Sequence, residues 1–176
     1  MTTGQTLLAV GAMMFLSTIL LNFYRLLGST GEDIAGGQDG ILATTIATSY
    51  LEIAQGLAFD RVTDTSEIAI SNPSALTSPA YLGPDGSSED SLHKFNDFDD
   101  LDGFAIEKEA GGTGRKFTTQ FSVCYVTPDN VEKVSTSHTF VKRMDLKTWR
   151  SYPPLTDPTR RDTLRISFVM GYFHFD

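Results

Sequence analysis

Residues 7–21 read LLAVGAMMFLSTILL, a run without a single charged side chain. The first charged side chain of the whole sequence is Arg25. Ser17 and Thr18 are the only polar members of the run, and in a helix their hydroxyl groups can bond back to carbonyls of the preceding turn. A helix over residues 4–24 rises about 30 Å, which matches the hydrocarbon thickness of a bilayer. The sequence therefore predicts an N-terminal hydrophobic helix, residues 1–27, that can span a membrane.

Two other interpretations of this run are open. A cleaved secretory signal has basic residues before its apolar stretch and small residues after it, whereas here no Lys or Arg precedes the run and Asn22, Phe23 and Tyr24 follow it. A helix in the core of a soluble protein can also be apolar on all sides. The chain that follows is small for enclosing such a helix completely. These properties favour a membrane helix.

Composition excludes several classes of function. The 176 residues include 14 Lys and Arg against 22 Asp and Glu, for a net charge of −8. Nucleic-acid binding is not expected, because it depends on clustered basic side chains. The lone Cys124 cannot form an intrachain disulfide. HExxH, G-x-S-x-G and paired-cysteine motifs are absent, so no catalytic residue, cofactor or metal is expected and the chain is predicted not to be an enzyme.

The segment after the apolar run is rich in glycine. Its glycines are Gly28, Gly31, Gly36, Gly37 and Gly40. Each disfavours helix by about 1 kcal/mol relative to Ala, so residues 28–40 are expected to be a non-helical break. Apolar side chains then recur at spacings of three and four, which predicts a second helix over residues 41–60. Acidic residues soon after Arg25 favour export of the chain that follows.

Residues 61–176 are expected to form a head domain with a loop layer and a sheet. Proline and glycine turn signals crowd the segment up to Gly103, which predicts an extended loop layer. Beyond it the apolar period changes to two, which is typical of strands. The predicted strands are residues 104–109, 116–126, 135–145 and 164–175. The fold class is therefore α+β, with the second helix covering a C-terminal antiparallel sheet.

An acidic loop precedes the first predicted strand. Its carboxylates are Asp97, Asp99, Asp100 and Asp102, directly before Gly103. Hard cations such as Ca²⁺ take several carboxylate oxygens, so a calcium loop is one interpretation. The other is a tight turn in which Asp side chains accept hydrogen bonds from nearby backbone amides. An EF-hand needs a helix on each side, and a strand is expected after this loop.

The N-terminus resembles a known family. Gly4-Gln5-Thr6-Leu7-Leu8-Ala9, followed by the apolar run, resembles the class III signal of type IV pilins and pseudopilins. Residues 43–60 and 95–103 resemble the helix end and the acidic loop of pilin-like proteins. The resemblance covers the first 60 residues, and beyond them only the order of elements. It implies a pilin-like fold and a helical homopolymer at the cell surface. The implied partners before assembly are the inner membrane, prepilin peptidase and the pilus assembly machinery.

The resemblance leaves the processing register open. If the chain is cut after Gly4, the fifth mature residue is Ala9, where the family has a Glu. If Met1 is already the mature terminus, the fifth residue is Gln5 and Tyr24 matches a Tyr often found there. Neither register supplies a carboxylate, so Gln5 is expected to form a neutral hydrogen bond during assembly. Leu16 and Leu20 are expected to lie in the apolar core of the assembly.

Three functions fit these observations. The first is a structural subunit of a type IV pilin-like extracellular filament that polymerises through its N-terminal helix. The second is a minor pseudopilin of a type II secretion-like machine. The third is a monomeric membrane-anchored binding domain. Filaments on the cell surface distinguish the first from the others.

Overall fold

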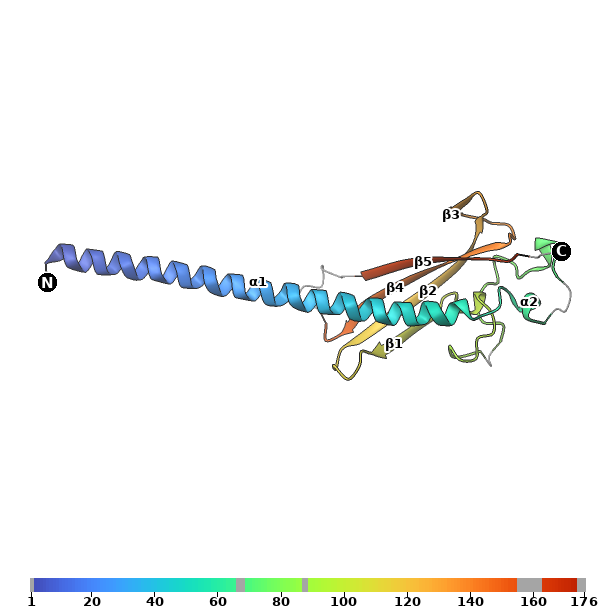
Figure 1. Ribbon diagram of the computed structural model, residues 1–176, viewed down its shortest axis with the longest axis horizontal. Coiled ribbons are helices and arrows are strands. Elements are labelled where there is room, and N and C mark those ends of the chain that lie inside the picture. The colour runs from blue at the N-terminus through green and yellow to red at the C-terminus, as the bar shows by residue number, and fades with distance from the viewer. Residues whose placement is uncertain (1, 66–68, 87–88, 155–162, 174–176) are drawn as a thin grey trace. The chain divides into compact units, whose positions relative to one another are not determined.

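The computed structural model describes residues 2–65, 69–86, 89–154 and 163–173 (Figure 1). It divides into two compact units, residues 1–40 and residues 41–176. The elements in chain order are helix α1 (Thr3–Gln55), helix α2 (Arg61–Thr65), 3-10 turns η1 (Pro73–Ala75) and η2 (Asp99–Leu101), and strands β1 (Ala105–Glu109), β2 (Lys116–Thr127), β3 (Asn130–Val134), β4 (Val141–Tyr152) and β5 (Thr163–Gly171). A long N-terminal helix followed by an antiparallel sheet confirms the α+β class.

Helix α1 is continuous through the glycine-rich segment, so the expected break at residues 28–40 is wrong. For the same reason residues 41–60 do not form a separate second helix, and α1 ends at Gln55. Extending an existing helix adds one hydrogen bond per residue, whereas the unfavourable nucleation step occurs only once. The segment contains no proline, and the Ser29 and Thr30 hydroxyls donate to the Leu26 carbonyl. The glycine penalty is therefore too small to interrupt the helix.

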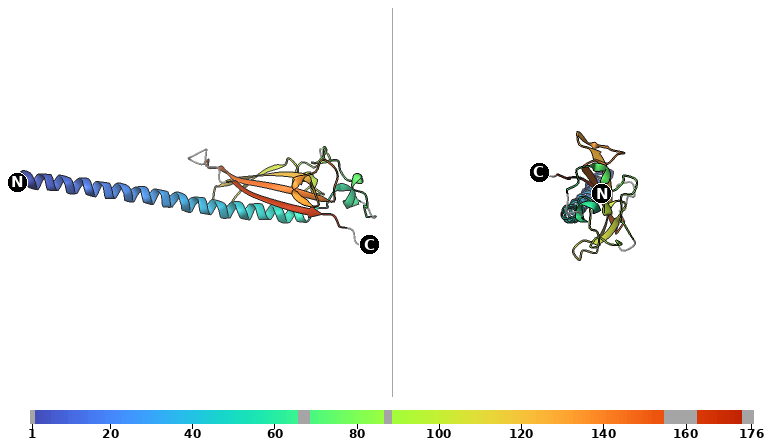
Figure 2. Two further views of the ribbon diagram at one scale, coloured as in Figure 1. Left: turned by 90° about the horizontal axis from the view of Figure 1, so that it is seen from above. Right: turned by 90° about the vertical axis from the view of Figure 1, so that its right-hand side faces the viewer.

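Residues 41–55 of α1 cover one face of the sheet, as predicted for this segment (Figure 2). The helix contributes small and apolar side chains to the core, and the Tyr50 ring meets the Phe121 ring edge-on with centroids 5.6 Å apart. The buried helix side chains are Ala43, Ile46, Ala47, Tyr50 and Ala54. Their spacing of three and four residues agrees with the predicted period, but Ile41 and Ile53, which belong to the predicted apolar stripe, are exposed.

The sheet has the strand order β1-β2-β4-β5, and β3 pairs with the far end of β2. All pairings are antiparallel. The strands expected at residues 104–109 and 116–126 are confirmed within one residue. The strand expected at residues 164–175 is confirmed as β5, but β5 ends at Gly171, so Tyr172 and Phe173 lie outside it and residues 174–175 lie outside the described residues. The predicted alternation in β2 is also confirmed, because the side chains on its core face are buried: Phe117, Thr119, Phe121, Val123 and Tyr125.

The predicted bounds of the strand at residues 135–145 are wrong, because the observed strand both begins and ends later in the chain. Residues 135–140 form a loop, and β4 begins at Val141 and continues to Tyr152. In that loop, Ser137 N donates to Ser135 Oγ and Thr139 Oγ1 donates to Val126 O. Such local side-chain bonds compete with strand pairing. The loop layer expected before Gly103 is confirmed, with α2, η1 and η2 as its short elements.

Candidate functional site

Residues 7–27 of α1 present a continuous exposed apolar surface, which we call the apolar helix surface. Its large exposed side chains are Leu7, Leu8, Val10, Met13, Met14, Phe15, Leu16, Ile19, Leu20, Leu21, Phe23, Tyr24, Leu26 and Leu27. Exposed apolar patches of this extent mark protein or membrane contacts. These side chains are not buried in a core of this chain, so the soluble-core interpretation of the run is wrong.

The serine and threonine hydroxyl groups of residues 7–27 are bonded within the helix. Ser17 Oγ donates to Met13 O at 2.8 Å, and Thr18 Oγ1 donates to Met14 O at 2.6 Å. This is the back-bonding that the sequence predicts. Among the described residues, α1 is the one helix whose length and composition would allow it to cross a membrane. The surface is thus suited to hydrocarbon or to other apolar helices.

The structure places the predicted assembly residues at two levels of α1. Gly4 and Gln5 lie in its first turn, where Gln5 Oε1 accepts a hydrogen bond from Thr2 N at 3.2 Å. Leu16, Leu20 and Tyr24 follow one another at spacings of four and therefore share one side of the helix. Their side chains are 58%, 47% and 69% exposed. The structure therefore gathers Leu16, Leu20 and Tyr24, and leaves Gly4 and Gln5 apart from them.

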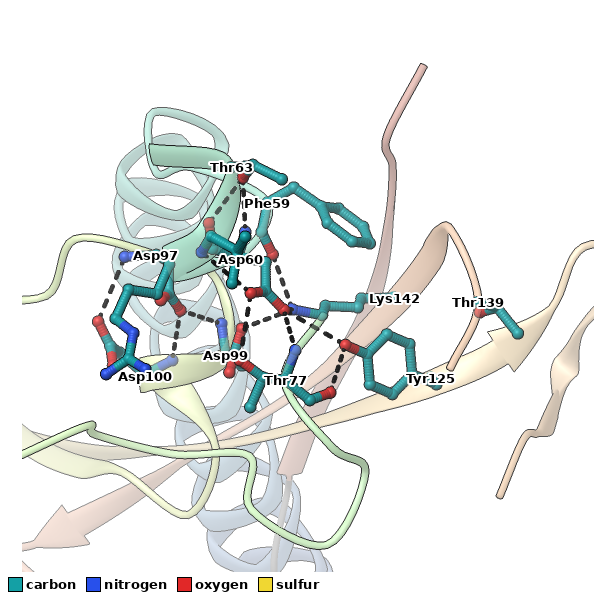
Figure 3. A network of polar contacts seen from close by, with 12 residues as sticks. Phe59, Asp60, Thr63, Thr77, Asp97, Asp99, Asp100, Tyr125, Thr139 and Lys142 are labelled. Carbon is teal, nitrogen blue, oxygen red and sulfur yellow. Dashed lines mark hydrogen bonds and ion pairs between the residues drawn. The ribbon is translucent and has the colours of Figure 1, made fainter. Parts of the chain in front are cut away.

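A second candidate site lies inside the unit formed by residues 41–176, around the ammonium group of Lys142 (Figure 3). Lys142 belongs to β4, and its side chain is fully buried. Its Nζ donates to Phe59 O at 2.8 Å, to Asp60 Oδ2 at 2.9 Å and to Asp99 Oδ1 at 2.5 Å. These contacts join the strand to the chain after α1 and to the acidic loop. We call Lys142, Asp60, Asp97, Asp99, Thr77 and Tyr125 the Lys142 network.

Asp60 is held as a carboxylate by several donors besides Lys142. Its Oδ1 accepts from Val62 N and Thr77 Oγ1, and its Oδ2 accepts from Thr77 N at 3.0 Å. Burial alone would raise the pKa of Asp60, but the charge of Lys142 and these hydrogen bonds outweigh it and lower the pKa. The Tyr125 hydroxyl has a single proton, and its shorter bond, at 2.8 Å, goes to Thr77 O.

The acidic loop forms a tight turn, as one of the two interpretations of the sequence expected. Asp97 Oδ1 accepts from the backbone amides of Asp99 and Asp100, and Asp100 Oδ2 accepts from those of Asn96 and Asp97. Asp102 points elsewhere in the fold and accepts from Val123 N at 2.7 Å. In the described part of the chain, no three His, Cys, Asp or Glu side chains are arranged to hold a metal. The tight-turn interpretation is therefore supported, and the described residues give the calcium interpretation no support.

Burial raises the pKa of three carboxyl groups of the loop, those of Asp97, Asp99 and Asp100. Burial, together with the charge of Asp99 and a hydrogen bond to it, raises the pKa of Asp97 to about 8. Burial also raises the pKa of Asp99, although the charge of Lys142 opposes the shift. Asp97 therefore keeps its proton at neutral pH and donates it in a hydrogen bond to Asp99.

The raised pKa of Asp97 predicts that stability falls as pH rises. The ordinary pKa of this carboxyl is 3.8 and its folded value is about 8, so between these limits the folded protein binds a proton that the unfolded chain releases. The contribution of the Asp97 carboxyl to the free energy of unfolding is fully present below pH 3.8 and is lost as the pH rises through about 8. We therefore expect the Tm to fall as the pH rises from about 5 to about 8.5. The fall should be about 2–4 °C for each kcal/mol of unfolding free energy that is lost.

Thermal unfolding of the full chain in detergent, followed by the fluorescence of its single Trp149, measures this dependence. Asp97→Asn is the matched variant, because its amide donates to Asp99 at every pH. The Tm of this variant should depend less on pH. Asp60, whose pKa is lowered, loses its contribution only at acid pH, outside this range. A Tm that rises with pH in the wild-type protein would contradict the prediction.

Sequence reasoning found the acidic loop but missed Lys142, Asp60 and Tyr125 as members of one network. The missed signal lies in β4, where Lys142, Met144, Leu146 and Thr148 alternate on the buried face. A lysine at a core-facing position of a strand requires a buried acceptor, because an unpaired buried charge is very unfavourable.

Comparison of the chain with family models, with curated proteins and with solved structures finds no match.

Proposed function

We propose that this chain is a structural subunit of a type IV pilin-like extracellular filament that polymerises through its N-terminal hydrophobic helix. The observation that carries the proposal is the apolar helix surface, residues 7–27, whose large side chains are exposed. An exposed apolar helix of this length needs either lipid or other apolar helices around it. Copies of the same helix supply such partners when the subunit leaves the membrane.

Further features support a filament subunit. The first residues resemble the class III signal of pilins, and a long N-terminal helix precedes an antiparallel sheet, which is the order that the family resemblance implies. The hydroxyls of Ser17 and Thr18 are bonded within their own helix, so helices can pack closely without leaving polar groups unpaired. The proposed route passes through the inner membrane, prepilin peptidase and the pilus assembly machinery. We propose no catalytic role and no nucleic-acid partner.

Electron microscopy of sheared cell-surface material tests the proposal. Negatively stained filaments that bind an antibody against residues 41–176 are the expected result. Short stubs confined to the cell envelope would favour the alternative of a minor pseudopilin of a type II secretion-like machine. Recovery of all of the chain in the membrane fraction as a monomer would instead identify a membrane-anchored binding domain and contradict the filament.

A further inference from the structure

The Lys142 network brings an amine and a carboxyl group together in a buried place. Lys142 lies on β4 and Asp99 in η2, 43 residues apart in the chain. Their side chains are both buried. We propose that Lys142 and Asp99 condense spontaneously to an intramolecular isopeptide bond that joins Lys142 Nζ to Asp99 Cγ. The proposal does not depend on filament assembly.

The Lys142 amine and the Asp99 carboxyl group already lie within reacting distance of each other. Lys142 Nζ lies 2.5 Å from Asp99 Oδ1, and the carboxyl carbon is one bond beyond that oxygen. Reacting atoms in a productive ground state are about 3–3.5 Å apart, so no rearrangement of the chain is needed. The rings of Phe59 and Tyr125 lie against the amine, with centroids 4.6 Å and 5.2 Å from Nζ. They exclude water, which would otherwise favour the charged groups.

Burial, rather than the neighbouring charges, works against the ion pair. Carboxyl groups outnumber the single ammonium group, since Asp60, Asp97 and Asp99 are all buried around Lys142. An ion pair in such a place loses the hydration of both charges, whereas an amide has no net charge to bury. The carboxyl groups also differ in their protonation. Asp97 holds a proton next to Asp99, while Asp60 is a carboxylate next to the amine.

These differences assign a role to each carboxyl group. Asp60 takes one proton from the Lys142 ammonium, and Asp97 passes its proton to Asp99. The free amine then attacks Asp99 Cγ, and its nitrogen returns a proton to Asp97. The hydroxyl of the tetrahedral intermediate leaves as water with the proton from Asp60. One N–C bond forms and one C–O bond breaks, an ammonium and a carboxylate become an amide and water, and nothing is oxidised or reduced.

The product removes the ammonium partner of Asp60 but leaves its carboxylate hydrogen-bonded. Once the ammonium is consumed, Asp60 still accepts hydrogen bonds from Val62 N, Thr77 N and Thr77 Oγ1. In the product, β4 is tied covalently to the acidic loop, beside the point where the chain leaves α1. Asp60 and Asp97 end in the protonation states in which they began. They act as proton carriers, and Lys142 and Asp99 are the groups joined.

Intact-mass spectrometry of the full chain, purified in detergent, tests the bond directly. The wild-type mass should lie below the sequence mass by one water, about 18 Da. Trypsin should release a branched peptide in which residues 95–108 are joined to residues 134–143, because a modified Lys142 is no longer cleaved. Fragmentation should place the link at Asp99. A chain at its full sequence mass, with these peptides separate, overturns the proposal.

Three variants complete the test. Lys142→Arg keeps a positive charge but cannot form the amide, so its mass should equal its sequence mass. Lys147→Arg changes an exposed lysine of the same strand and should retain the loss of one water. Asp99→Asn should react by losing ammonia, which gives the same product and therefore the same mass as the reacted wild-type chain. A loss of water that persists in Lys142→Arg would place the modification elsewhere and overturn the assignment.

Discussion

Cells that produce the Leu16→Asp variant should make no filaments. Leu16 lies in the middle of the apolar helix surface, with its side chain 58% exposed. A carboxylate at the centre of a helix in hydrocarbon is unfavourable by about 2.5–3.5 kcal/mol, and the same penalty recurs in every subunit of the polymer. No charged side chain lies between residues 1 and 24 to pair with it in a neighbouring copy. Leu20→Asp should have the same effect.

Filament yield in sheared surface fractions measures this effect, and the amount of subunit in the membrane fraction shows whether insertion also fails. Leu16→Met is the matched control, since it keeps an apolar side chain and should assemble normally. Gln5→Ala should weaken assembly by only about 1 kcal/mol per contact, the usual net contribution of a neutral hydrogen bond. Normal filaments from Leu16→Asp together with none from Gln5→Ala would contradict assembly through the apolar helix surface.

The second large effect is expected in the head unit, residues 41–176. Phe121→Ala should lower the free energy of unfolding by about 3–5 kcal/mol, the usual result of removing a buried aromatic ring. Phe121 is 1% exposed at the centre of β2. Its ring contacts Tyr50 from α1 and Phe104 from the start of the sheet, with centroids 5.6 Å and 6.0 Å away. The truncation therefore opens a cavity between the helix and the sheet.

Denaturant unfolding of the full chain in detergent, followed by Trp149 fluorescence, measures the loss. Phe173→Ala is the matched control, because it removes the same ring from a position that is 77% exposed. Its effect should stay within about 0.5 kcal/mol, as is usual for surface substitutions. If the two variants lost equal stability, the helix-covered face of the sheet would not be the main core of this unit.

The processing role of Gly4 and Gln5 is a prediction from a short local motif, and the structure adds only that Gln5 Oε1 accepts from Thr2 N. The opposite holds for the Lys142 network. Its acidic loop is visible in the sequence. Lys142, however, lies 82 residues from Asp60 and 43 residues from Asp99 along the chain. No spacing rule links residues at such separations, because their proximity depends on how β4 and the loop layer fold together.

By itself, the sequence determined the apolar helix, the α+β class, the helical segment that covers the sheet and the alternation in β2. Each of these depends on near neighbours, since burial on one side of a helix or strand imposes a period of 3.6 or 2 on the sequence. The structure decided the rest. Helix cooperativity overrode the glycines of residues 28–40, and local hydrogen bonds moved the start of β4 to Val141. Only the tertiary structure placed Lys142 among carboxylates, because burial of a charge is stable only where distant parts of the chain bring its acceptors together.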